Sequence, residues 1–234
     1  DLIGFGWSPL FESVLSLRAV AQPKRTPMHL PWARRCRELL PEELHREIEE
    51  LIRPFDRYVP GTFEVGLTGD RPGWDDELAA FRALGDDVVA WELSLAVAGS
   101  GCPAADDDPV RIQDPGRRDA ILRDAAAGGR EALARAILDD PGAVRDRYAR
   151  LLERYWDLAF GAEWERILPR IEAEVTDGAR ALVTQGVPGL VEELLPEGRW
   201  DAATSAIVVD KDWDGACDVS ERGPLLFVPT VYGW

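Results

Sequence analysis

The chain has 234 residues, of which 46% are hydrophobic and 30% charged, and its formal net charge is −16. This size and composition allow a substantial core and are typical of a globular protein. The acidity argues against a nucleic-acid interface or an anionic membrane surface within these residues, because both partners are held by Lys and Arg. No apolar run approaches the roughly 20 residues of a transmembrane helix.

The cysteines and the first residues indicate the compartment. Cys36, Cys102 and Cys217 are scattered and form no C-x2-C pair, which favours a reducing environment. The opening residues DLIGFGW show no signal-peptide pattern. We therefore expect a cytoplasmic protein. Because the first residue is not Met, we also expect that the encoded protein has lost residues before Asp1.

Proline marks the helix starts in the first part of the chain. After a short apolar strand, LIGFGW, Ser8 and Pro9 predict an N-cap and first position of a helix over residues 8–22. Its apolar residues recur at helical spacing and widen into a broad stripe, which predicts a largely buried helix. Pro31 and Pro41 are expected to start the next two helices.

The middle of the chain is also predicted to be helical. We expect helices over residues 75–84, 86–98, 117–126, 130–138, 141–185 and 187–195, with a joint at Gly161 and a kink or restart at Pro169. A small, acidic and proline-rich loop over residues 99–116 separates the first two from the others. The chain is expected to form a single domain over residues 1–234, with a possible subdivision at this loop.

The periodicity changes near the C-terminus. ATSAIVVD and PLLFVPTVYGW are rich in β-branched and aromatic residues and predict two strands joined as a hairpin. The predicted fold class is therefore mainly α (α+β), a multi-helix domain with a short N-terminal strand and a C-terminal β-hairpin.

The connection between these strands, DKDWDGACDVSE, matches the calcium-loop pattern D-x-[DN]-x-[DN]-G-x5-E. The candidate ligands are carboxylates, with Gly215 at the sharp turn: Asp210, Asp212, Asp214, Asp218 and Glu221. An EF-hand needs a helix on each side, whereas both flanks here are strand-like, and no second loop occurs. Calcium binding, as a weak site outside an EF-hand, and an exposed acidic hairpin turn both stay open; no other cofactor is predicted.

Few residues offer catalytic chemistry. The two histidines, His29 and His45, lie in no HExxH pattern, and with Cys36 they lack zinc-ligand spacing. The chain also lacks a Gly-x-Ser-x-Gly elbow, a P-loop and a GxGxxG fingerprint. We therefore predict no catalytic residues, no metal site and no enzymatic activity.

Two features allow ligand binding. Four of the nine tryptophans fall on or beside predicted buried faces: Trp7, Trp32, Trp156 and Trp164. Core packing explains them, and an aromatic-lined pocket for a small ligand is the alternative. The segment PKRTPMHLPWARRCR is basic and carries no acid. A solvated helix face or a docking surface for acidic residues explains it, and contact with an anion is the alternative.

Three stretches resemble a family of bacterial ArsR-like transcriptional regulators. FGWSPLFESVLSLRAVAQPKRTPMHLPW resembles the opening of these proteins, and YWDLAFGAEWERILPRIEAEV and RGPLLFVPTVYGW resemble later parts. The resemblance covers nearly the whole chain and implies an N-terminal, mostly helical region that precedes a winged helix-turn-helix. Its motifs are core and turn patterns rather than catalytic signatures.

The resemblance implies a sensor or dimerisation module that controls DNA binding. The winged helix is expected after Trp234, so DNA would be contacted only through that further domain. A small-molecule effector and a homodimer are the expected partners, and no ligand-binding residue is assigned. No cysteine cluster or His/Asp set indicates metal sensing. The alternative is a small-molecule-binding protein, an enzyme or a calcium-binding protein on a helical scaffold.

Overall fold

The computed structural model describes residues 3–67, 71–99, 109–195, 197–210, 219 and 223–233. The elements are, in chain order, β1 (Ile3–Phe5), α1 (Pro9–Ala21), the 3-10 helix η1 (Pro27–His29), α2 (Leu30–Leu39), α3 (Glu42–Leu51), the 3-10 helix η2 (Gly61–Phe63), α4 (Trp74–Arg82), α5 (Asp86–Ala98), the 3-10 helix η3 (Pro109–Gln113), α6 (Pro115–Ala127), α7 (Glu131–Asp139), α8 (Pro141–Tyr155), the π-helix η4 (Trp156–Phe160), α9 (Gly161–Leu194), β2 (Gly198–Asp201), β3 (Ala206–Val209) and β4 (Leu225–Phe227). The prediction of a mainly helical fold is confirmed. None of the described helices has the length and apolarity that crossing a bilayer requires.

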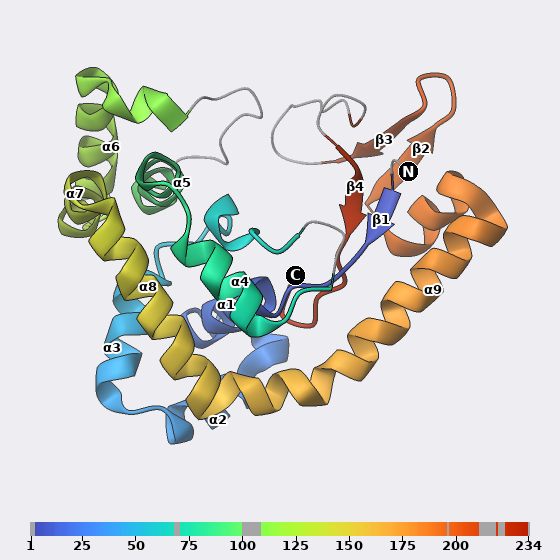
Figure 1. Cartoon of the computed structure of the whole chain (residues 1–234), viewed down its shortest axis with the longest axis horizontal. Coiled ribbons are helices and arrows are strands. Elements are labelled where there is room, and N and C mark those ends of the chain that lie inside the picture. Colours follow the sequence, from blue (N-terminus) through green and yellow to red (C-terminus); the bar gives the residue numbers. More distant parts are fainter. Residues whose placement is uncertain are drawn as a thin grey trace.

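The first helix, α1, lies in the middle of the molecule (Figure 1). Ser8 caps it as predicted, because its hydroxyl accepts a hydrogen bond from the Phe11 amide at 2.9 Å. Almost every residue of α1 is buried, including the polar residues Glu12, Ser13 and Ser16. A helix that is buried all round belongs to the core, so its few polar side chains need partners inside the protein.

Helices α8 and α9 form a long frame in Figure 1, in which α8 descends on the left and α9 rises from the bottom along the right-hand side. The π-helix η4 joins them, where the sequence predicts a joint. The helix α9 continues through Pro169 rather than restarting there. Its backbone leaves the helical region at Gly186, where φ is 69°, a value that glycine adopts without steric cost. The predicted separate short helix at the end of this region therefore begins after Gly186.

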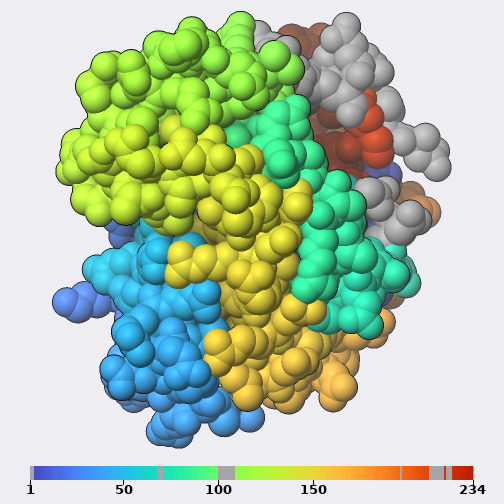
Figure 2. Space-filling model, turned by 60° about the vertical axis from the view of Figure 1, so that its left-hand side comes forward, coloured from blue at the N-terminus to red at the C-terminus, as the bar shows by residue number. Residues whose placement is uncertain are grey.

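The remaining helices pack on this frame. On the face shown in Figure 2, α8 forms a yellow band between the green α6 and α7 and the blue α2 and α3, with α4 and α5 on the other side. Four core rings meet where these helices contact α8. Phe63 lies with its ring centroid 5.7 Å from Phe55, 5.2 Å from Phe81 and 5.6 Å from Tyr148. The Tyr148 hydroxyl donates to the Leu51 carbonyl at 2.8 Å, so this buried phenol is satisfied.

The strands form two small sheets. The strand β2 pairs antiparallel with β3, and this is the C-terminal hairpin. The strand β4 instead pairs in parallel with the N-terminal strand β1, with Gly4 opposite Leu226. The sequence-based pairing of ATSAIVVD with PLLFVPTVYGW is therefore wrong, because the unpredicted β2 supplies the local antiparallel partner.

The β1–β4 pair is held against α9. At Gly178 of α9, a Cβ atom would lie 2.7 Å from Cε1 of Phe5, so the missing side chain lets the helix approach the strand. The Phe5 ring also stacks on Phe227 of β4, with a centroid distance of 5.6 Å. Phe5 of the first strand thus contacts both α9 and the last strand.

Replacing Phe63 with Ala tests the aromatic centre of the core. Phe63 is fully buried, so Phe63→Ala should lower the free energy of unfolding by about 3–5 kcal/mol. Denaturant unfolding followed by circular dichroism measures the change. The control Val183→Ala removes a side chain that is 85% exposed and should stay within about 0.5 kcal/mol of the parent. A loss below about 1 kcal/mol in Phe63→Ala would contradict this packing.

Candidate functional site

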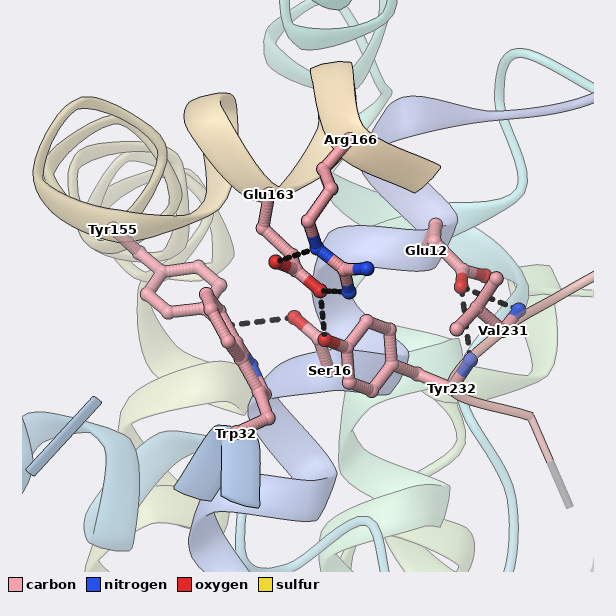
Figure 3. Close-up of polar contacts among 8 residues, drawn as sticks. All are labelled: Glu12, Ser16, Trp32, Tyr155, Glu163, Arg166, Val231 and Tyr232. Atoms are coloured by element: carbon pink, nitrogen blue, oxygen red, sulfur yellow. Dashed lines mark hydrogen bonds and ion pairs between the residues drawn. The ribbon is translucent and has the colours of Figure 1, made fainter. Parts of the chain in front are cut away.

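The C-terminal segment, residues 228–233, returns from β4 to α1 and α9. Both the Val231 and the Tyr232 amides donate hydrogen bonds to Oε1 of Glu12, at 2.7 and 2.9 Å. The Tyr232 hydroxyl donates to Oε1 of Glu163 at 2.7 Å. Figure 3 shows Tyr232 between these two carboxylates, with its backbone at Glu12 on α1 and its ring directed to Glu163 on α9. The segment is therefore attached to two helices through its last described residues.

Glu12 is an unusual partner because it belongs to the core. Its side chain sits in the buried α1, and only 2% of the residue is exposed. Burial raises the pKa of Glu12 to about 7, against the opposing effect of the Tyr232 and Val231 amides. The carboxyl group therefore changes its charge near neutral pH while it binds the C-terminal segment.

Glu77 on α4 is a second buried carboxyl group that binds α1. Its Oε2 accepts a hydrogen bond from the Leu10 amide at 2.7 Å, at the positive end of the α1 dipole. Burial raises the pKa of Glu77 to about 7, and the Ser8 hydroxyl and the Leu10 amide oppose the increase. The two buried carboxyl groups that bind at the first turn of α1, Glu12 and Glu77, thus both have a pKa raised to about 7.

The pKa of Glu163 is lowered, whereas those of Glu12 and Glu77 are raised. Burial opposes its ionisation, but hydrogen bonds from Arg166 and Tyr232 outweigh burial and place the pKa of Glu163 below its usual value. Arg166 donates from Nε to Oε2 at 2.9 Å and from Nη2 to Oε1. Glu163 is therefore an ionised acceptor for the Tyr232 phenol, and the pKa of that phenol is raised, first by burial and then by this carboxylate.

A buried polar network lies behind the segment. The Tyr155 hydroxyl of α8 lies 2.8 Å from Oγ of Ser16 on α1 and accepts a hydrogen bond from Trp32 Nε1 on α2 at 3.1 Å. The Trp32 ring in turn lies 5.9 Å from the Tyr232 ring, between centroids. Because the buried hydroxyl needs these partners, the network fixes α1, α2 and α8 relative to one another. Burial also raises the pKa of the Cys36 thiol beside it to about 12, which disfavours the nucleophilic thiolate form.

A hollow of about 280 Å³ opens beside the segment, and we call it the Tyr232 hollow. It is lined by aromatic, apolar and charged residues from α2, α9, the preceding η1 and the C-terminal segment: Met28, His29, Pro31, Trp32, Arg35, Glu163, Arg166, Val231 and Tyr232. The His29 ring lies 4.8 Å from the Tyr232 ring. Ligand pockets combine apolar walls with a few convergent polar groups. The hollow has this composition, and one wall is the C-terminal segment itself.

A larger hollow of about 640 Å³ lies between the α2–α3 junction and η4. Its lining includes the exposed apolar side chains Leu39 and Leu158 with Arg154 and Asp157. Arg154 already forms an ion pair with Glu43 at 3.0 Å. No buried polar side chain lines this hollow, so the Tyr232 hollow is the better candidate although it is smaller.

The structure brings together only some of the predicted residues. Trp32 lines the Tyr232 hollow, whereas Trp156 stacks on Trp74 at 4.1 Å and Trp7 and Trp164 are core residues. Of the basic segment, Arg35 lines the hollow. In the described parts of the chain, no three His, Cys, Asp or Glu side chains are grouped as metal ligands. Asp210 is described, but the other candidate calcium ligands, Asp212, Asp214, Asp218 and Glu221, lie outside the described residues.

Glu12, Glu163 and Tyr232 were not predicted as site residues. Glu12 is the one charged residue of the mostly apolar stretch PLFESVLSL, and a lone acid on a helix predicted to be buried signals an internal partner. Glu163 and Arg166 show the three-residue spacing of a helical ion pair, which is common on exposed helices and carries no such signal.

The protein is mainly helical, and its C-terminal segment docks on buried carboxyl groups beside a small aromatic hollow. The chain belongs to the family described as "Family of unknown function (DUF5937)", which matches residues 1–234. No curated protein and no solved structure matches the chain.

The titration of Glu12 gives a pH prediction. A carboxyl group whose pKa is raised in the folded protein binds its proton more tightly there than in the unfolded chain. Its favourable contribution is therefore complete below about pH 4.5 and is lost as the pH rises to about 7. Glu12→Gln keeps one oxygen that accepts both amides and removes the titration. This variant should gain about 2–3 kcal/mol relative to the parent between pH 5 and pH 8.

Denaturant unfolding of both proteins at pH 5 and pH 8 measures this difference. The matched control is Glu165→Gln, which changes an exposed glutamate on the same protein and should leave the pH dependence of the parent unaltered. Equal pH dependence in Glu12→Gln and the parent would show that Glu12 does not titrate in this range.

Proposed function

We propose that the chain is the ligand-sensing module of an ArsR-like transcriptional regulator and controls a winged-helix DNA-binding domain that follows residue 234. The observation that carries the proposal is the attachment of Val231 and Tyr232 to Glu12 and Glu163 beside the Tyr232 hollow. A domain attached after residue 234 would be connected directly to this segment. A binding role suits the hollow better than catalysis, and such a regulator would act in the cytoplasm.

The proposed control needs two states of the C-terminal segment. In the docked state, the segment supplies Val231 and Tyr232 to the wall of the hollow. In a released state, the hollow would lose this wall, so a ligand would bind the two states with different affinities. A difference of this kind is what lets a ligand shift a conformational equilibrium and couple two sites.

The surrounding helices supply a rigid base for this switch. The Tyr155 network joins α1, α2 and α8, and the Arg166–Glu163 pair fixes the acceptor on α9. Three ring contacts, to His29, Trp32 and Phe160, surround Tyr232. The segment is thus attached to this base through the side chains of Glu12 and Glu163 and through ring contacts of Tyr232.

The coding sequence downstream of residue 234 is the first test. The proposal expects a winged helix there, and the full-length product should select specific genomic DNA fragments. The variant Tyr232→Ala removes the bond to Glu163 and the ring that lines the hollow. It should change the affinity of the full-length protein for a selected fragment by about fivefold or more, measured by fluorescence anisotropy at constant salt.

The control Val183→Ala alters an exposed side chain of α9 and should leave DNA affinity unchanged. Circular dichroism establishes whether each variant is folded. The proposal is wrong if no DNA-binding domain follows residue 234, or if folded Tyr232→Ala binds DNA as the parent does.

A further inference from the structure

The Tyr232 hollow carries a charge opposite to that of the protein. The chain as a whole has a formal net charge of −16. The hollow is lined by two guanidinium groups, Arg35 and Arg166, and one carboxylate, Glu163, which leaves one positive charge in excess. Burial lowers the pKa of His29, so this ring adds no charge at neutral pH. An anion is therefore favoured in the hollow although the rest of the molecule repels it.

The two arginines are in different situations. Arg166 already donates from Nε and Nη2 to Glu163. Arg35 is exposed on α2 and forms no hydrogen bond or ion pair with the described residues, although its positive charge helps to lower the pKa of Glu163. Its planar guanidinium group therefore has all its donors available to an incoming anion. A carboxylate accepts two parallel hydrogen bonds from such a group, which fixes its orientation.

The rings of the hollow select the rest of the ligand. Trp32 and Tyr232 lie with ring centroids 5.9 Å apart and their planes inclined at 51°, and the His29 ring lies 4.8 Å from Tyr232 with its plane inclined at 44°. Inclined rings favour contact with the edge or face of another ring. Drug-sized ligands occupy pockets of about 300–1,000 Å³, so a hollow of about 280 Å³ accepts a smaller molecule.

We infer that the Tyr232 hollow binds a small aromatic carboxylic acid as its anion, with the carboxylate on Arg35 and the ring against Trp32 and Tyr232. This inference rests on the proposed function, in which the hollow is the effector site, and names the effector class. The single excess positive charge matches a monoanion, whereas the second charge of a phosphate ester would face Glu163 without a free partner. The ligand contacts Tyr232 of the C-terminal segment and therefore favours the docked state.

Binding is tested with the 234-residue chain and defined probes. Benzoate, phenylacetate and indole-3-acetate are the aromatic anions. Benzamide and phenylacetamide keep the ring without the charge, and acetate keeps the charge without the ring. Isothermal titration calorimetry and ligand-observed NMR measure affinity. At least one aromatic anion should bind saturably with a dissociation constant below about 10 mM, and its amide and acetate should bind about tenfold or more weakly.

The variant Arg35→Gln locates the site. Because Arg35 pairs with no described residue, its loss should leave the fold intact while affinity for the aromatic anion falls about tenfold or more. Arg37→Gln is the matched control, since Arg37 lies exposed on the same helix and does not line the hollow. The inference is overturned if none of the three anions saturates, if the amides bind equally well, or if Arg35→Gln binds as tightly as the parent.

A failure of the aromatic-anion inference can be distinguished from a failure of the proposed regulatory function. If the anions do not bind but Tyr232→Ala still changes DNA affinity in the full-length protein, the ligand class is wrong and the regulatory role stands. If an anion binds through Arg35 but leaves the DNA affinity of the full-length protein unchanged, the site stands and the regulatory role is wrong.

Discussion

The burial of one carboxyl group, Glu12, is the constraint on which the C-terminal part of the structure depends. A carboxylate inside a protein core costs several kcal/mol unless hydrogen bonds compensate for the lost water. Here the Val231 and Tyr232 amides provide that compensation from the far end of the chain. Undocking the segment would leave the group either charged without these partners or protonated. Docking and protonation of Glu12 are therefore linked, and neither can be understood from α1 alone.

The central helix α1 takes part in several buried polar contacts of this kind. Glu77 binds the Leu10 amide in the first turn of α1, Glu12 of the same turn binds the C-terminal segment, and Ser16 contacts Tyr155 one turn later. Polar residues inside a buried helix restrict how that helix can be placed, because each needs a partner in one position. In this chain, the partners come from α4, the C-terminal segment and α8, so a shift of α1 would disturb all three.

Local patterns in the sequence predict the helices better than the site. Proline starts and helical spacing locate α1, α5 and α8 closely, because these signals lie within the element itself. The pairing of β4 with β1 is long-range, and a three-residue strand carries no mark of its partner. The Tyr232 hollow is equally hard to predict from the sequence, because its walls come from distant parts of the chain that no spacing rule connects. Trp32 and the basic residue Arg35 were visible as candidates, but only the structure shows that both border the same hollow.

The docking of the C-terminal segment on Glu12 has a consequence for the order of folding. Val231 and Glu12 are 219 positions apart in the chain, and joining residues over such a separation costs loop-closure entropy, so we expect this contact to form after the local helical contacts. During synthesis, helices α1 to α9 are made before residues 228–233, so Glu12 meets its two amide partners only after those residues have been made. The hollow beside Tyr232 is therefore completed only when residues 228–233 dock, so a single event supplies the hydrogen-bond partners of a core carboxyl group and closes one wall of the hollow.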